Sequence, residues 1–184
     1  MAERSLFRMM NAMTVIEADA SHVEYLSEFG RKSFIYAYQC TLPLEELTKY
    51  IQVAFSESTI LEEINGSLAT YFICQDSNSK PCGYAKLIQS DAPECIQSGS
   101  MELQRLYVDS DHRGHGVGKR LEKQVETYSR NHDIHTLWLR VWEGNMVAQD
   151  IYKKWGFSII GEEPYQVGED QRTVLIMNKP LSSS

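Results

Sequence analysis

A glycine-rich turn, Arg113-Gly114-His115-Gly116-Val117-Gly118, joins a strand-like run to a helix-like run in this 184-residue chain. Glycine lets the backbone adopt positive φ and approach a ligand closely, and the N–H groups of the helical turn that follows point outward. Such a turn suits a phosphate or pyrophosphate group, for which Arg113 and Lys119 supply positive charge. A bare strand-to-helix turn has a similar composition, so both interpretations stay open on this motif alone.

Two common phosphate-binding loops fit this segment less well. A Walker loop closes with Gly-Lys and then Ser or Thr, but Gly118-Lys119 is followed by Arg120. A dinucleotide-binding turn is followed about 20 residues later by an acidic side chain, where this chain has Leu-Trp-Leu-Arg (137–140). If the turn binds a phosphate, it therefore does so in another fold.

Strand-like and helix-like segments alternate around the turn, which predicts a mixed α/β layer. We expect strands over residues 13–18, 68–74, 83–88, 101–108, 135–142, 157–161 and 173–179. We expect helices over residues 22–39, 43–55, 58–64, from the turn to about residue 130, and over 146–155. Residues 1–12 are expected to be a flexible leader, 13–180 a single domain, and 181–184 a disordered tail.

Composition argues against several classes of function. The formal net charge of −7 disfavours nucleic-acid binding, which needs a concentrated basic surface. No apolar run approaches the ~18 residues of a membrane helix, and no secretory segment is recognisable. The four cysteines lack the spacing of a zinc site, and the four histidines at 112, 115, 132 and 135 fit a surface better than a metal site. We expect a cytoplasmic monomer or homodimer with reduced thiols, no metal, and neither a membrane nor a nucleic-acid partner.

Two motifs together resemble the GNAT family of N-acetyltransferases. The turn over residues 113–118 matches that family's R/Q-x-x-G-x-G/A acetyl-CoA loop, and LWLRVWEGNMVAQDIYKKWGF (137–157) resembles its strand, Asn-led helix and Tyr-x-x-x-Gly-Phe ending. The pattern over about residues 13–179 looks most like the PaiA-type polyamine N-acetyltransferases. The resemblance implies an α/β fold whose central, mostly antiparallel, twisted sheet of about seven strands splays between strands 4 and 5 and is flanked by helices.

The resemblance also implies which residues hold the cosubstrate, acetyl-CoA. Backbone groups of Leu106, Tyr107 and Val108 would receive the pantetheine amides and the acetyl carbonyl, and the Val108 N–H would face the developing oxyanion. Asn145 would hydrogen-bond the pantetheine arm. The remaining cofactor-binding residues are Arg113, Gly114, His115, Gly116, Val117, Gly118, Lys119, Ala148, Tyr152 and Lys154.

Two residues are the catalytic candidates. Tyr152 matches the family's general-acid tyrosine, which protonates the departing thiolate. Helix spacing alone favours a core-facing stripe for Tyr152, and the match of the flanking motif reverses that preference. Glu102 lies where members with a carboxylate base carry one, because an alkylammonium must lose a proton before it attacks. The alternatives for Glu102 are an edge carboxylate, an ion-pair partner of Arg105, or a residue that orients a water.

The acceptor implied by the resemblance is a polyamine such as spermidine or spermine. Carboxylates and aromatic faces suit a polycation, although ordinary surface charges would give the same pattern. The substrate-facing candidates are Tyr36, Tyr38, Glu45 and Glu94, with Glu46, Tyr50 and Asp91 near them. Acetylation of a protein N-terminus or lysine is the first alternative, and a non-catalytic acetyl-CoA-binding module is the second.

Overall fold

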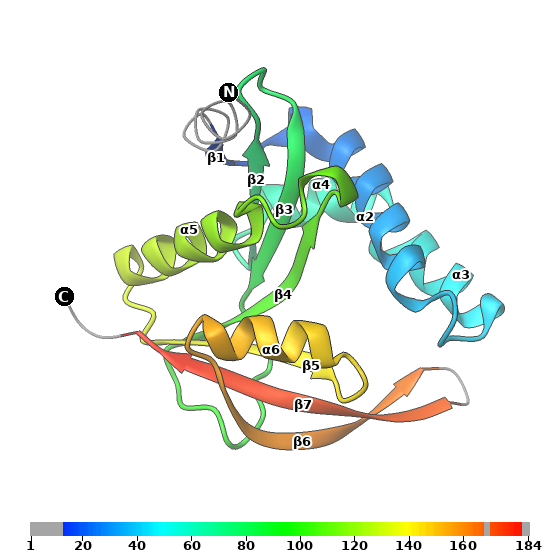
Figure 1. The fold of residues 1–184 in the computed structure, drawn as a ribbon, viewed down its shortest axis with the longest axis vertical. Helices are drawn as coiled ribbons and strands as arrows, with labels where there is room; N and C mark the ends of the chain where they lie inside the picture. The colour runs from blue at the N-terminus through cyan, green and yellow to red at the C-terminus, as the bar shows by residue number, and fades with distance from the viewer. Residues whose placement is uncertain (1–12, 168–169, 182–184) are drawn as a thin grey trace.

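The computed structural model describes residues 13–167 and 170–181, which build one seven-stranded sheet with helices on both faces (Figure 1). In chain order the elements are β1 (Thr14–Glu17), η1 (Ala20–His22), α2 (Val23–Tyr38), α3 (Leu44–Ala54), α4 (Glu57–Asn65), β2 (Ala69–Gln75), β3 (Pro81–Ile88), β4 (Ser100–Val108), η2 (Ser110–His112), α5 (Val117–Asn131), β5 (Thr136–Trp142), α6 (Met146–Lys154), β6 (Ser158–Val167) and β7 (Asp170–Pro180). The leader expected over residues 1–12 and the last three residues of the expected tail lie outside the described residues. Leu181, the first residue of that tail, is instead buried.

The strand order is β1-β2-β3-β4-β5-β7-β6, and every neighbouring pair is antiparallel except β4 and β5. The parallel pairing covers only residues 100–102 of β4 and 136–138 of β5. Beyond that short contact the two strands diverge, as Figure 1 shows. The predicted fold class, a mostly antiparallel sheet splayed between the fourth and fifth strands, is therefore confirmed.

A β-bulge in β4 coincides with the start of this divergence. Leu103 pairs with Leu87 of β3 and Arg105 pairs with Lys86, so Gln104 has no partner in the ladder. A bulge bends its strand and increases the local twist. The bend therefore begins two residues past Glu102, the last residue of β4 that pairs with β5.

The bulge also changes which side chains of β4 face which side of the sheet. Met101 and Leu103 before the bulge pack in the same core as Leu106 and Val108 after it, although Leu103 and Leu106 are an odd number of positions apart. Tyr107 packs against the core on the opposite side. Without the unpaired Gln104, the period of two would put Leu103 and Leu106 on opposite faces.

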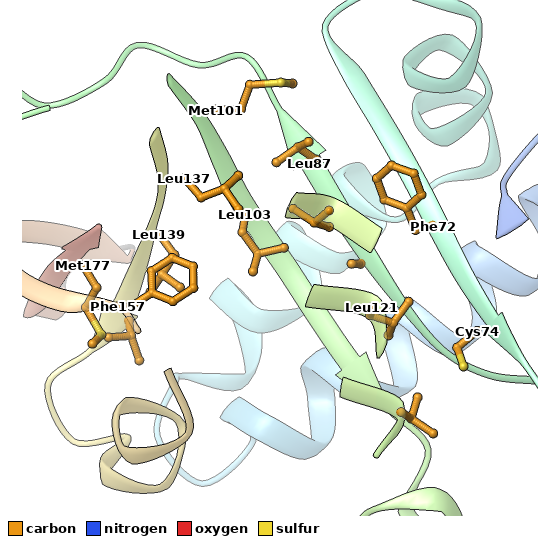
Figure 2. Close-up of a cluster of buried hydrophobic side chains, with 14 of the residues drawn as sticks. Phe72, Cys74, Leu87, Met101, Leu103, Leu121, Leu137, Leu139, Phe157 and Met177 are labelled. Atoms are coloured by element: carbon orange, nitrogen blue, oxygen red, sulfur yellow. The ribbon is translucent and has the colours of Figure 1, made fainter. Parts of the chain in front are cut away.

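Two hydrophobic cores hold the helices to the sheet. On one face, Val117, Leu121 and Val125 of α5 are buried against β2 to β5, and Figure 2 shows Leu121 among the buried side chains of these strands. Helix α6 packs at the margin of this core. On the other face, Leu26 of α2 and Ile60 of α4 pack with the tyrosines of β2 and β3. Within the described ranges, no helix is long and apolar enough to cross a membrane.

The last two strands are longer than the sequence pattern predicts. Expected over residues 157–161 and 173–179, they run over Ser158–Val167 and Asp170–Pro180 and pair with each other from Ser158–Asn178 to Val167–Asp170. The sequence of β6 turns to Glu162-Glu163-Pro164, which lacks the apolar alternation of a half-buried strand. Because β5 ends at Trp142, opposite Val174, the outer part of the β6–β7 hairpin projects beyond β5.

Candidate active site

A cleft of about 700 Å³ lies where β4 and β5 diverge. Helices α2 and α3 form one wall, β4 and β5 form the floor, and the outer half of the β6–β7 hairpin forms the other wall. The lining residues are Phe34, Tyr38, Leu42, Glu46, Lys49, Tyr50, Val53, Ala54, Glu102, Gln104, Arg105, Tyr107, Arg140, Trp142, Glu163, Tyr165, Gln166, Arg172 and Val174.

The structure brings some of the predicted residues into this cleft and leaves others outside it. Tyr38, Glu102 and Tyr107 all line it. Glu45 does not; it is exposed and pairs with Lys49, with 2.7 Å between Oε1 and Nζ. Glu94 is exposed in the connection between β3 and β4 and does not line the cleft either. Successive side chains of an α-helix are rotated by about 100° around its axis. Glu46, rather than Glu45, therefore lies on the cleft side of α3.

Tyr36 lies beside the glycine-rich turn and not in the cleft. Its ring is exposed, and the Arg113 guanidinium carbon lies 4.9 Å from the ring centroid. Arg113 also donates from Nε to the Val108 carbonyl oxygen, at 3.4 Å. Helix α2, the end of β4 and the turn before α5 therefore meet around one cationic side chain.

The turn before α5 has the geometry of an anion site. Gly114 and Gly116 have φ of 78° and 83°, in the left-handed region that glycine adopts without strain. Gly116 is the N-cap of α5, and no side chain caps this helix. The N–H groups of its first turn are therefore available to a phosphate, whose charge the helix dipole also favours. Gly118 lies close to the Trp155 ring at the end of α6. A Cβ at this position would come within 3.1 Å of that ring.

Lys119, predicted to bind a phosphate, already has an ion pair. Its Nζ lies 2.7 Å from Oε2 of Glu122, which is fully buried, and Lys179 Nζ lies 2.6 Å from the other oxygen of that carboxylate. Side chains on α5 and β7 are thereby joined through one buried acid. A ligand at the turn would share Lys119 with Glu122.

Glu102 is buried at the vertex of the splay, with a donor on each of its oxygens. Ser90 Oγ donates to Oε2 at 2.7 Å, and Arg140 Nη1 donates to Oε1 at 3.1 Å. Arg140 also pairs with Glu163 of β6. Glu102 is therefore an ion-pair partner, but of Arg140 on β5 and not of Arg105. In the described part of the chain, no three His, Cys, Asp or Glu side chains gather as a metal site.

Tyr152 of α6 is half-buried, with its ring edge-to-face against Trp155 and Phe157 at centroid distances of 5.8 Å. Burial raises the pKa of Tyr152 to about 12, with a smaller contribution in the same direction from the phenol of Tyr38. The phenol is therefore protonated at neutral pH and has a proton to donate.

Asn145 has a role that the sequence pattern did not reveal. It is the N-cap of α6, and its Oδ1 accepts a hydrogen bond from the Ala148 N–H at 3.1 Å. Only its amide NH₂ group is then left to donate to a ligand. Ala148 packs at the margin of the core, and Lys154 is exposed at the end of the helix.

Several cleft residues were missed by sequence reasoning. They are mostly charged or aromatic and come from β4, β5 and the hairpin: Arg105, Arg140, Trp142, Glu163, Tyr165 and Arg172. The polar pair Gln104-Arg105, which interrupts the apolar alternation of β4, is the signal that would have exposed the bulge and so the direction of Arg105. The hairpin residues gave no such signal.

Comparison with known proteins gives a family match over most of the chain. The family model described as acetyltransferase (GNAT) family matches residues 33–157. A curated relative, an uncharacterized N-acetyltransferase in the pepI 3′ region of Lactobacillus delbrueckii subsp. lactis, is 24% identical over 176 residues, which cover 94% of this chain and 99% of that protein.

Solved structures share the fold. The PaiA N-acetyltransferase from Thermoplasma acidophilum, in complex with coenzyme A, superposes with a TM-score of 0.74 at 23% identity and covers 91% of this chain and 98% of its own. A spermidine N-acetyltransferase chimera from Vibrio cholerae SpeG and hSSAT gives a TM-score of 0.69 at 19% identity, over 92% and 96% of the two chains. At these identities the likeness extends to the fold alone.

The capping bond of Asn145 and its predicted contact with the cosubstrate are separable by mutation. Asn145→Ala removes the cap of α6 and is expected to lower the free energy of unfolding by about 0.5–2 kcal/mol. Asn145→Asp keeps a capping oxygen but loses the amide donor, so it is expected to unfold like the wild type and to bind acetyl-CoA more weakly. Denaturant unfolding and calorimetric titration measure the two effects. Unchanged affinity in Asn145→Asp would exclude contact of the amide NH₂ group with the cosubstrate.

Proposed function

This chain belongs to the acetyltransferase (GNAT) family, and from that premise we propose that it transfers the acetyl group of acetyl-CoA to a primary amine bound in the 700 Å³ cleft. It is an N-acetyltransferase of the GNAT type that uses acetyl-CoA. The observation that carries the proposal is the splay of the sheet. It opens the cleft along the unpaired edge of β4, and the turn before α5 lies at the end of the same strand, where Arg113 donates to the Val108 carbonyl oxygen.

The residues of the turn and of β4 suit the two ends of acetyl-CoA. The N–H groups at the start of α5, with Arg113, would hold the phosphates. Past Glu102, the edge of β4 toward β5 has no strand partner in the described residues, so its backbone groups are available to the pantetheine amides. Leu106, Tyr107 and Val108 lie on this free stretch. The bound thioester supplies the acetyl group.

Tyr152 is the general acid of the proposed mechanism. A thiolate leaving group needs a proton, and a phenol whose pKa lies near 12 carries one at every pH at which the protein would work. The ring contacts with Trp155 and Phe157 fix the direction of the phenol. Core packing and proton donation are compatible here, because the two ends of the side chain perform them separately.

The base is Glu102 or a water beside it. Glu102 lines the cleft at the vertex of the splay, where an amine approaching the acetyl group would pass. Its hydrogen bonds from Ser90 and Arg140 fix the carboxylate in place. A carboxylate accepts several hydrogen bonds, so Glu102 can retain both donors and still receive a proton from the amine or from an intervening water.

For the acceptor, a polyamine remains the prediction made from the sequence resemblance. The aromatic side chains of the cleft support it, because aromatic rings attract cations and five of them line the cleft: Phe34, Tyr38, Tyr50, Trp142 and Tyr165. The ion pairs of the cleft weigh against it. Its three carboxylates, those of Glu46, Glu102 and Glu163, each pair with a lysine or arginine. A primary amine on a small molecule is therefore the acceptor class that we propose, with polyamines as its first members to test.

A thiol-release assay over a panel of amines tests this function. We expect release of coenzyme A with small primary amines, and with spermidine if the polyamine prediction holds. Release with peptides alone would favour acetylation of a protein N-terminus or lysine. A folded protein that binds acetyl-CoA in a calorimeter and releases no thiol with any amine would be a non-catalytic binding module.

Tyr152→Phe tests the general acid. We expect kcat to fall by about 100-fold, because general-acid catalysis contributes factors of this order, while acetyl-CoA affinity changes little. Because burial disfavours the phenolate and raises the pKa to about 12, wild-type kcat should show no alkaline loss near pH 10, where an ordinary tyrosine ionises. Kinetics from pH 6 to pH 11 measure both. Unchanged turnover in Tyr152→Phe would remove the phenol from the mechanism.

Glu102→Gln tests the base. If the carboxylate takes the proton, kcat/KM at neutral pH should fall by about 100-fold, and activity should recover only as the pH approaches the pKa of the amine. Ser90→Ala is the matched control, because it removes one hydrogen bond to Glu102 and leaves the carboxylate. An unaltered pH profile in Glu102→Gln would assign the proton transfer to water alone.

A further inference from the structure

Arg105 is a buried arginine in the cleft wall that the proposed mechanism does not use. Only 7% of the residue is exposed, yet it lines the cleft. Its position follows from the bulge at Gln104, since the apolar residues on both sides of the bulge face the core of α5 and Arg105 does not. A full charge is thus held at the boundary between the protein interior and the proposed acceptor site.

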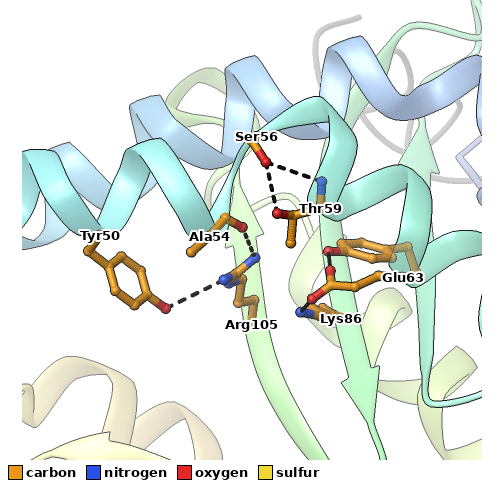
Figure 3. A network of polar contacts seen from close by, with 8 residues as sticks. Tyr50, Ala54, Ser56, Thr59, Glu63, Lys86 and Arg105 are labelled. Atoms are coloured by element: carbon orange, nitrogen blue, oxygen red, sulfur yellow. Dashed lines mark hydrogen bonds and ion pairs between the residues drawn. The ribbon is translucent and has the colours of Figure 1, made fainter.

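The contacts of Arg105 are all with uncharged groups. Its Nη1 donates to the Ala54 carbonyl oxygen at 3.3 Å and its Nη2 to the Tyr50 hydroxyl at 3.4 Å, as Figure 3 shows. The guanidinium carbon lies 4.1 Å from the centroid of the Phe55 ring. No carboxylate in the described ranges forms an ion pair with it. Burial raises the pKa of Tyr84 and Tyr107, so these neighbouring phenols are neutral and do not offset the charge.

The acid drawn with Arg105 in Figure 3 is Glu63, and it is already engaged. Glu63 accepts from Lys86 Nζ at 2.6 Å and from the Tyr71 hydroxyl, and Lys86 is itself buried. Lys86 and Arg105 are thus two buried cations, and Glu63 forms an ion pair with Lys86 alone. An uncompensated buried charge costs several kcal/mol unless a partner approaches it, so this is an arrangement in which a ligand anion would stabilise the protein.

The other charged side chains of the cleft show how different Arg105 is. Arg140 is flanked by Glu102 and Glu163, and Lys49 by Glu45 and Glu46. In total, four lysines and arginines line the cleft against three glutamates, in a protein whose net charge is −7. The cleft is thus less acidic than the molecule as a whole.

We propose that the acceptor amine also carries a carboxylate, and that Arg105 binds this carboxylate from the wall of the cleft. The inference rests on the proposed function and narrows it to amino acids and related amino-carboxylates. The guanidinium presents its donors in a fork that matches the two oxygens of a carboxylate. A polyamine would bring further positive charge toward Arg105 and leave that charge without a partner.

A matched series of acceptors tests the proposal. We would measure kcat/KM for ω-amino acids of increasing chain length, for their terminal amides, and for spermidine. The ω position keeps the basicity of the amine similar across each pair. We expect the best carboxylate to exceed its amide by about 10- to 100-fold, which is the value of one charge-assisted interaction, and to exceed spermidine. Equal values for carboxylate and amide, or a preference for spermidine, would overturn the proposal.

Variants of Arg105 separate carboxylate binding from a structural role. Arg105→Gln should abolish the preference for carboxylate over amide, and Arg105→Lys should restore part of it, while both keep acetyl-CoA affinity. Lys49→Gln removes the same unit charge from an exposed, paired side chain of the cleft and should retain the preference. A preference that survives in Arg105→Gln would show that the carboxylate binds elsewhere.

Binding of the acetylated products distinguishes failure of this inference from failure of the proposed function. Calorimetry with N-acetylated ω-amino acids and their amides needs no turnover. A carboxylate preference that Arg105→Gln removes would support the subsite even if no amine released thiol, in which case only the proposed function would fail. Turnover of amines without any such preference in binding would overturn the carboxylate subsite and leave the proposed function in place.

Discussion

The early end of pairing between β4 and β5 is the constraint on which the site depends. Three residue pairs join the strands, and the bulge at Gln104 then turns β4 away. The same bend opens the cleft, frees the edge of β4 and returns Leu106 and Val108 to the core after Leu103. A regular β4 would continue the ladder with β5, and the cleft and the free edge would both be lost.

An open sheet needs support on both faces, because its separated strands lose hydrogen bonds and mutual contact. The fully buried Leu121 of α5 packs against the strands on one face, and the fully buried Leu26 of α2 packs on the other. The buried Glu122 joins Lys119 of α5 to Lys179 of β7 across the two halves of the sheet. With the halves fixed from outside the gap, the edge of β4 can remain available to a ligand that has amides of its own.

The sequence predicted the parts of this arrangement that depend on local patterns. The glycine turn and the position of Tyr152 on a helix follow from motifs and periodicity, and the splayed sheet follows from the family resemblance. Side-chain direction was harder: a shift of one residue separates Glu45 from Glu46, and the capping bond of Asn145 depends on backbone angles. The outer hairpin was missed because strand pairing, and not apolar burial, holds its residues in register.

The match to the family model ends at residue 157, before the hairpin that forms one wall of the cleft. Glu163, Tyr165 and Arg172 therefore lie outside the matched segment, although they line the cleft. The residues that we propose for acetyl transfer are local to β4, α5 and α6, whereas the charges around the proposed acceptor site come from α3, the bulge and the hairpin. Proteins that share this fold can therefore use different acceptors. The net charge of the chain is negative, but it does not describe the charge of the cleft, where a buried arginine has no carboxylate partner among the described residues.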